Sequence, residues 1–397
     1  MNSSQTSQVN QLLDSLWGLR RSWFGSTQAS SSAAAAPSPS TTPDAEAGSR
    51  ILQLPADVLL LICDELETPE ALSLSLACKS TYALCFALCH KKMTVDDRRK
   101  FLLLLEKDPG MGRGVFYCHT CNYLHPFQPY WGPHSEPEAS SEPSLHHCGN
   151  RDRFAPIGNR FDLSYTHARL AMNDHFYGPG RGIPLENLCI EHTEHRDWTS
   201  VLCSTDAKIK NDELYLLRTY TFTIPNDSIA EFRKCTGARD FRLCEHTSFF
   251  SNTSVYRQYV PELQRRPASG GEGFATCKDS PGSCGLCLMD YDITIAPAQD
   301  NPAWDVTIKA HHQLGACRTP DDWKWARFTE ACRAHLFFPN RPNRRGSTHN
   351  AGVVKQRWSE TATKQPDAKK VSGQKSFPIP FPTWLWRDTK PLSVGSN

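Results

Sequence analysis

The residues of this sequence best suited to chemistry are cysteines and histidines at short spacings. They form three pairs: Cys118 with Cys121, Cys244 with His246, and Cys284 with Cys287. Two thiolates separated by two residues can reach one tetrahedral zinc ion, and a second pair can complete its coordination. We therefore predict structural zinc, with buried thiols flanking a turn as the alternative interpretation of each pair.

Two zinc sites are predicted. In the first, His125 and Cys148 join Cys118 and Cys121, with His146 and His147 as alternative ligands. In the second, Cys244 and His246 meet Cys284 and Cys287 across 37 intervening residues, with Cys277 close by in the sequence. A third group, Cys189 with His192 and His195, is a weaker prediction because the charged residues around it are typical of a solvated face.

The composition narrows the class of protein. Sixteen cysteines in 397 residues are far fewer than the roughly 8–10% that marks a disulfide scaffold, and the N-terminus has no secretory leader pattern. We therefore expect a reducing compartment, cytoplasmic and/or nuclear. The net charge of +2 does not favour nucleic acid as a partner, and no apolar run is long enough to predict a membrane span.

Sequence motifs of enzymes are absent. The chain has no G-x-S-x-G elbow, no H-E-x-x-H zinc motif and no G-x4-G-K-[ST] phosphate loop. A zinc enzyme would also need a positioned glutamate base, which no motif indicates. We predict that the protein is not an enzyme, and keep a zinc-containing nucleic-acid-binding or regulatory protein as the alternative function.

A helical block is expected from Leu54 to about Leu105. Pro55 suits the first position of a helix, Thr68 with Pro69 suits the start of a second, and Tyr82 lies in a third. The three short helices carry more apolar surface than so small a unit can bury internally. Some of this surface should therefore contact another protein or domain.

The same block resembles an F-box, on the run Leu54, Pro55, Asp57, Val58, Leu59, Ile62, Leu66, Ala71, Leu72, Leu76, Ala77, Cys78, Lys79 and Tyr82. The resemblance implies that the segment binds a Skp-type linker, and through it a cullin, in an SCF ubiquitin ligase. The implied contact residues are Leu54, Pro55, Val58, Leu59, Ile62, Leu66, Leu72 and Leu76. The chain would then be a substrate adaptor, with an unknown protein substrate bound by the C-terminal domain.

Residues 98–330 resemble a group of fungal F-box-like proteins, mostly uncharacterised. The shared residues include Phe101, Leu102, Glu106 and Asp108 in the first motif, and Leu314, Gly315, Cys317 and Trp325 near the end. This resemblance implies a shared domain and no particular activity.

The fold class predicted is α+β: a three-helix F-box followed by a mixed, mainly antiparallel domain with disordered termini. Strand-like runs at 115–117, 214–224, 291–295 and 306–309 support this. The predicted parts are a tail at 1–49 with a short helix at 9–24, the F-box at 50–95, the Cys/His domain at 96–335, and a basic tail at 336–397. Within that last tail, residues 341–375 hold nine Lys or Arg and two acidic residues, a net +7 predicted to be disordered, and 377–386 is an aromatic and proline segment predicted to dock on the core.

Overall fold

The computed structural model of the chain describes residues 53–133, 153–156, 158, 161–196, 199–238, 241–250, 258–268, 270–271, 273–284, 286–299, 302–329 and 349–360. The predictions for 1–49 and for 377–386 fall outside these residues. Contacts between residues divide the chain into two units, with the boundary after Arg113.

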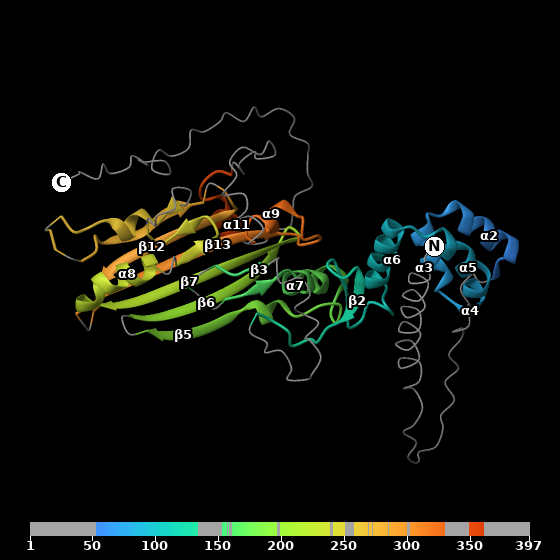
Figure 1. Cartoon of the computed structure of the whole chain (residues 1–397), viewed down its shortest axis with the longest axis horizontal. Helices are drawn as coiled ribbons and strands as arrows, with labels where there is room; N and C mark the ends of the chain where they lie inside the picture. The colour runs from blue at the N-terminus through green and yellow to red at the C-terminus, as the bar shows by residue number, and fades with distance from the viewer. Residues whose placement is uncertain are drawn as a thin grey trace, which may run out of the picture. The chain divides into compact units, whose positions relative to one another are not determined.

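The first unit is helical, as predicted. Its elements are α2 (Ala56–Glu65), α3 (Thr68–Ser75), α4 (Lys79–Thr81), the π-helical segment η2 (Tyr82–Phe86), α5 (Ala87–Lys92) and α6 (Val95–Lys107) (Figure 1). Helix α3 is capped by Glu67, one residue before the expected Thr68, because Glu67 and Glu70 form a reciprocal capping box. The expected third helix corresponds to α4, η2 and α5, which follow one another without a break.

Helix α6 completes this unit. It packs against α3 and buries Phe101, Leu102 and Leu105, which recur at helical spacing on one face. Its start is fixed by Thr94 and Asp97, whose side chains each accept from the other's backbone N–H. The predicted boundary between the F-box and the Cys/His domain, at residue 95, therefore lies inside the first unit, which continues to Arg113.

The second unit is built on one six-stranded antiparallel sheet, which confirms the predicted fold class. The strands lie in the order β11-β12-β13-β7-β6-β5. Their bounds are β5 (Ile190–Arg196), β6 (Thr199–Lys210), β7 (Glu213–Pro225), β11 (Cys277–Ser283), β12 (Met289–Pro297) and β13 (Ala303–Gly315). Asn211 and Asp212 turn β6 into β7 with φ of 51° and 59°, the left-handed conformation that asparagine and aspartate tolerate.

Smaller elements surround this sheet. The two-stranded pairs are β1 (Val115–Cys118) with β2 (Tyr123–Pro126) and β3 (Arg153–Phe154) with β4 (Leu163–Ser164), and a three-stranded sheet contains β8 (Arg242–Cys244), β9 (Thr247–Ser248) and β10 (Gln258–Tyr259). The helices are α7 (Tyr165–Tyr177), η4 (Leu185–Leu188), η5 (Asn226–Ser228), α8 (Ile229–Ala238), η6 (Pro261–Gln264), α9 (Trp323–Ala326) and α11 (Val353–Ser359). Among the described strands, β9 and β10 pair in parallel and the others antiparallel.

One face of the large sheet forms the core. Tyr220, Phe222 and Ile224 alternate along β7 and are fully buried, as expected where one side of a strand faces the interior. Helix α8 packs against β7, and Phe241 meets Phe222 edge to face with ring centroids 5.4 Å apart. This aromatic packing positions the loops that carry the candidate site.

Helix α11 is a correction to the sequence prediction. It lies inside the segment 341–375, which was expected to be disordered because of its net positive charge. Residues 349–360 are instead ordered, and α11 packs on β12 and β13 with Val354 fully buried. Composition does not reveal this helix because charged side chains on distant strands, Asp290 and Lys210, hold its two ends. Within the described part of the chain, no helix has the length and apolarity needed to cross a membrane.

Candidate functional site

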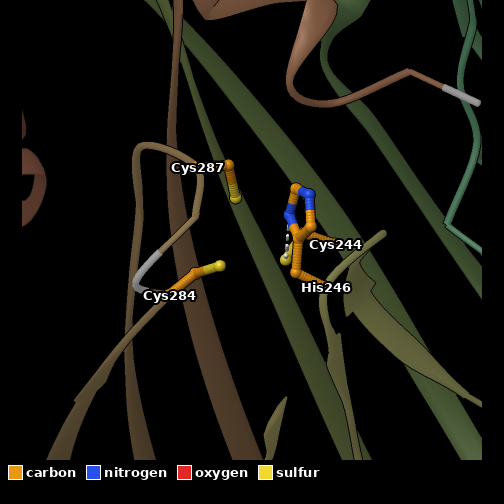
Figure 2. A group of neighbouring side chains, drawn as sticks. All are labelled: Cys244, His246, Cys284 and Cys287. Atoms are coloured by element: carbon orange, nitrogen blue, oxygen red, sulfur yellow. Dashed lines mark hydrogen bonds between the residues drawn. The ribbon is translucent and has the colours of Figure 1, made fainter. Parts of the chain in front are cut away.

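Four predicted ligands meet at one buried point in the second unit. The Sγ atoms of Cys244, Cys284 and Cys287 and a ring nitrogen of His246 all lie within 4.8 Å of one another. Figure 2 shows the three sulfur atoms and the imidazole facing a common centre. The predicted convergence of the two pairs is therefore confirmed.

Two hairpin turns supply these ligands. Cys244 ends β8 and His246 immediately precedes β9, whereas Cys284 follows β11 and Cys287 comes just before β12. The Leu286 backbone N–H points to Cys284 Sγ at 3.4 Å, a contact that stabilises a thiolate in a C-x2-C turn. The site thus joins the small sheet to the large one.

The donor set fits a tetrahedral zinc ion. Zinc–sulfur bonds of about 2.3 Å place neighbouring sulfurs about 3.8 Å apart in a tetrahedron, so the observed separations need to contract by at most about 1 Å. All four ligands are buried. Four protein ligands closing the shell are typical of a structural ion and leave no position for a reactive water.

The electrostatics of the four groups also suit a cation. Burial would raise the pKa of the Cys284 thiol, but hydrogen bonds with Cys244, Cys287 and His246 outweigh it and hold that pKa well below its usual value. Burial raises the pKa of both Cys244 and Cys287, and the contact with Cys284 raises each further. The cluster therefore favours one ionised thiol beside two protonated thiols, and a bound metal ion would displace the remaining protons.

Two polar contacts hold the backbone beside the ligands. Nε2 of His312, on β13, donates to the Leu243 carbonyl at 3.1 Å, the residue before Cys244. Burial lowers the pKa of His312 to about 3, so this imidazole stays neutral at physiological pH. Arg242 and Glu245 form a buried ion pair at 2.9 Å on either side of Cys244.

The first predicted site is partly assembled. Cys118, Cys121 and His125 bring ligand atoms within 4.8 Å of one another, and the backbone N–H of Cys121 points to Cys118 Sγ at 3.5 Å. The hairpin register explains the geometry, since His125 pairs with Phe116 and alternation places Phe116 and Cys118 on the same face. Nε2 of His125 is buried without a hydrogen-bond partner among the described residues.

The remaining predicted ligands do not join either cluster among the described residues. Cys148, His146 and His147 lie outside the described residues, so the fourth ligand of this site stays a prediction. Cys277 lies at the far end of β11 from Cys284, with its thiol near the Ile293 carbonyl at 3.6 Å. The weaker group at Cys189 is not among the metal-binding clusters of the described residues.

The predicted linker-binding residues separate by burial. Leu59 and Leu72 are 3% and 0% exposed and form the core of the helical unit, so they support a contact surface without forming it. Ile62, Leu66 and Leu76 are partly buried. Leu54 and Val58 are 37% and 38% exposed, and Pro55 is exposed as well.

Two exposed leucines of the first unit are not among the predicted linker-binding residues. Leu61 on α2 and Leu88 on α5 are 66% and 55% exposed, the highest values among the described leucines of this unit. The sequence places Leu61 in a stripe with Val58 along α2, because residues three apart in a helix share a face.

Comparison with known protein families identifies the helical segment of the first unit. Residues 51–92 match the family model of the F-box domain. No curated protein and no solved structure matches the chain significantly, so the fungal resemblance over 98–330 stays a prediction. The helices α2–α5 and their exposed apolar residues fall within the matched segment, and residues 51–92 of this chain form an F-box domain.

Proposed function

We propose that this protein is a substrate adaptor of an SCF-type ubiquitin ligase. F-box domains bind Skp-type linkers, which connect them to a cullin, and F-box proteins are typically adaptors without enzymatic activity. The observation that carries the proposal is the family match at 51–92 on helices that leave Leu54, Val58 and Leu61 exposed. The second unit would bind the protein substrate.

The exposed residues have the chemistry that a linker contact requires. Removing a large aliphatic side chain from water contributes about 1.5–3 kcal/mol when burial is complete, so a few such residues can dominate the affinity of an interface. Leu61 and Leu88 have the most area to lose in such a contact, since more than half of each is exposed.

In this adaptor, zinc has a structural role. We propose zinc at Cys244, His246, Cys284 and Cys287, because three thiols and one imidazole are a zinc donor set and all four are buried. A second zinc is proposed at Cys118, Cys121 and His125. A reducing location, the cytoplasm or the nucleus, would keep these thiols available for metal.

The test is co-purification of the tagged full-length protein with a Skp-type linker and cullin. The double variant Leu54→Asp, Pro55→Ala should weaken linker binding by at least about 100-fold, because an unpaired carboxylate would be buried in an apolar interface. Leu61→Asp should weaken it for the same reason.

Val95→Asp is the matched control. Val95 is 72% exposed on α6 and lies outside the matched segment, so its substitution should leave linker binding unchanged. Equal recovery of linker by the wild type, the Leu54→Asp, Pro55→Ala double variant and Leu61→Asp would contradict the adaptor function. Recovery of nucleic acid in place of linker and cullin would favour the alternative of a nucleic-acid-binding protein.

A further inference from the structure

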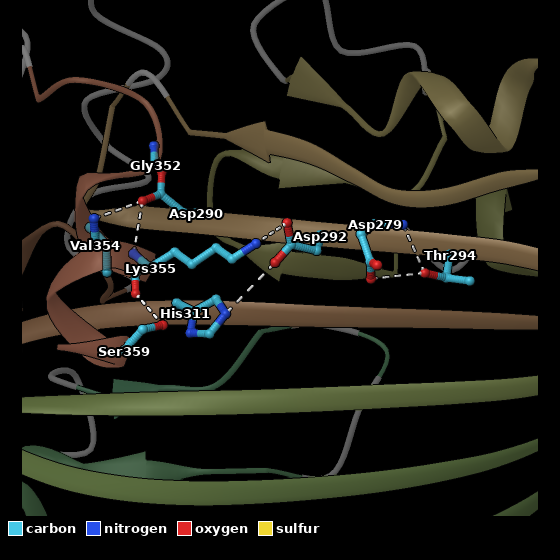
Figure 3. Close-up of polar contacts among 9 residues, drawn as sticks. All are labelled: Asp279, Asp290, Asp292, Thr294, His311, Gly352, Val354, Lys355 and Ser359. Atoms are coloured by element: carbon cyan, nitrogen blue, oxygen red, sulfur yellow. Dashed lines mark hydrogen bonds and ion pairs between the residues drawn. The ribbon is translucent and has the colours of Figure 1, made fainter. Parts of the chain in front are cut away.

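Helix α11 lies across the outer face of the large sheet, and its N-terminus is held by a single buried side chain. The Asp290 carboxylate on β12 accepts hydrogen bonds from the backbone N–H groups of Gly352, Val354 and Lys355 at 3.0, 2.7 and 3.1 Å (Figure 3). No side chain of the segment itself caps the helix. The sheet therefore supplies the negative charge that a helix N-terminus favours.

The C-terminal end of the same helix is held by positive charge. Lys210 on β6 donates to the carbonyls of Arg357 and Glu360 at 2.8 and 3.0 Å, and Lys208 donates to the carbonyl of Trp358 at 3.0 Å. Strands β12, β13, β7 and β6 are consecutive in the sheet. Acidic and basic groups thus stand at the two ends of the helix with the polarity that complements its dipole.

Side chains between these ends add specificity. Nζ of Lys355 contacts Asp292 at 2.7 Å, and Lys208 lies over the Trp358 ring at 4.7 Å from its centroid. Val354 is the one fully buried residue of the described helix. The sheet surface therefore recognises a short helix mainly by its ends, a lysine in its first turn and an aromatic residue in its last.

This surface needs an occupant. Asp290 is buried, and a buried carboxylate without a partner is strongly unfavourable. The helix that satisfies it is separated from the preceding described residue, Thr329, by residues 330–348, and few of its own side chains are buried. Exchange of α11 for another helix with the same donors leaves Asp290 paired, whereas simple release does not.

We propose that the surface formed by Asp290, Asp292, Lys208 and Lys210 is a receptor for a short helical peptide, which α11 occupies within the same chain. The competing partner is a substrate helix with a glycine at its N-cap, a lysine in its first turn and an aromatic residue in its last. This inference rests on the proposed adaptor function and specifies the substrate class.

The test inserts a protease recognition sequence between residues 340 and 341 of the full-length chain. After cleavage, a fluorescein-labelled peptide of residues 349–360 is titrated in, and fluorescence anisotropy reports binding. The peptide should bind the cleaved protein and bind the uncleaved protein at least about 10-fold more weakly, because α11 is tethered there. A peptide carrying Lys355→Glu should bind the cleaved protein at least about 10-fold more weakly than the native peptide.

Three results would overturn the proposal: no exchange in cleaved protein that stays folded, equal binding to cleaved and uncleaved protein, or equal binding of the native and Lys355→Glu peptides. Circular dichroism establishes that the cleaved protein stays folded. Should cleavage unfold it, an Asp292→Asn variant of the intact chain replaces that arm, and unchanged protease sensitivity of the 349–360 segment in it also overturns the proposal. None of these measurements uses the linker, so their failure is distinct from failure of the adaptor function.

Discussion

At the scale of single residues, the chemistry of the Cys/His cluster is set by which of its thiols keep their protons. Three thiols and an imidazole share one buried centre, and without a cation their pKa values diverge because only one thiolate can be stabilised by the others. A zinc ion would hold all three thiolates at once, and its binding free energy would add directly to the stability of the fold.

Substitution of one ligand should therefore remove both metal and stability. We expect Cys284→Ser to lose one zinc per chain and to lower the free energy of unfolding by more than about 3 kcal/mol. Zinc content by elemental analysis and denaturant unfolding measure the two effects.

Cys203→Ser is the matched control for this variant. Cys203 is a buried thiol on β6 and is not part of either metal cluster of the described residues. It should keep the full zinc content and lose little stability. Equal zinc content in Cys284→Ser and wild type would show that these thiols are ordinary core residues.

At the scale of elements, the N-terminal cap of helix α6 should contribute to the stability of the first unit. Oγ1 of Thr94 accepts from the Asp97 backbone N–H at 3.1 Å, and this cap fixes the start of a helix whose Phe101, Leu102 and Leu105 are buried. Thr94→Ala should destabilise the unit by about 1 kcal/mol. Thr94→Ser, which keeps the oxygen, is expected to restore most of this loss in a thermal denaturation experiment.

The docking of α11 should depend on pH through Asp290. This carboxylate faces His349 and the Lys355 backbone N–H from the docked segment, and Ser283 and His311 from the sheet. Burial opposes its charge, but hydrogen bonds from His349, Gly352 and Lys355 outweigh burial and lower its pKa. The stabilisation is present above the ordinary aspartate pKa of about 3.9 and is lost as pH falls through the lowered value.

Hydrogen exchange of residues 349–360, corrected for the intrinsic rate, measures this loss. Protection should fall below about pH 4 in the wild type, whereas Asp290→Asn should show weaker protection at neutral pH and no such step. Zinc loss in acid affects both proteins equally, so a step that persists in Asp290→Asn would assign the effect to the metal site.

At the scale of the whole molecule, the division after Arg113 separates the F-box from the metal clusters. Both clusters belong to the second unit, and the described residues of the first unit, 53–113, contain no such group. The two units should therefore respond differently to removal of zinc.

We expect a chelator in reducing buffer to destabilise the second unit and spare linker binding. If zinc contributes about 5 kcal/mol, its removal lowers the melting temperature of a unit of this size by roughly 10–20 °C. Calorimetry with and without added zinc measures this shift, and a linker pull-down before and after chelation measures binding. Loss of linker binding on chelation would show that the F-box depends on the second unit.

Local patterns in the sequence were enough to predict the helices of the first unit and part of the large sheet, but not β2, β8, β9 or β11, which carry or flank the Cys/His ligands. The capping and apolar spacing of 54–105 predicted the helices, because these signals act within a few residues of one another. Alternating and β-branched runs predicted strands that became β1, β7, β12 and β13 for the same reason. The residue types and spacings of the Cys/His pairs predicted their chemistry.

Long-range packing decided the rest. Spacing alone could not place Cys244 beside Cys284, since only the arrangement of two hairpins brings residues 40 positions apart to one centre. Leu59 is buried and Leu61 is exposed because the other helices cover only one face of α2. Helix α11 was invisible to composition because its caps, Asp290 and Lys210, come from distant strands. The sequence by itself determined the local structure and the chemistry of each ligand, whereas the tertiary structure decided which groups meet, because contact free energy depends on separation in space.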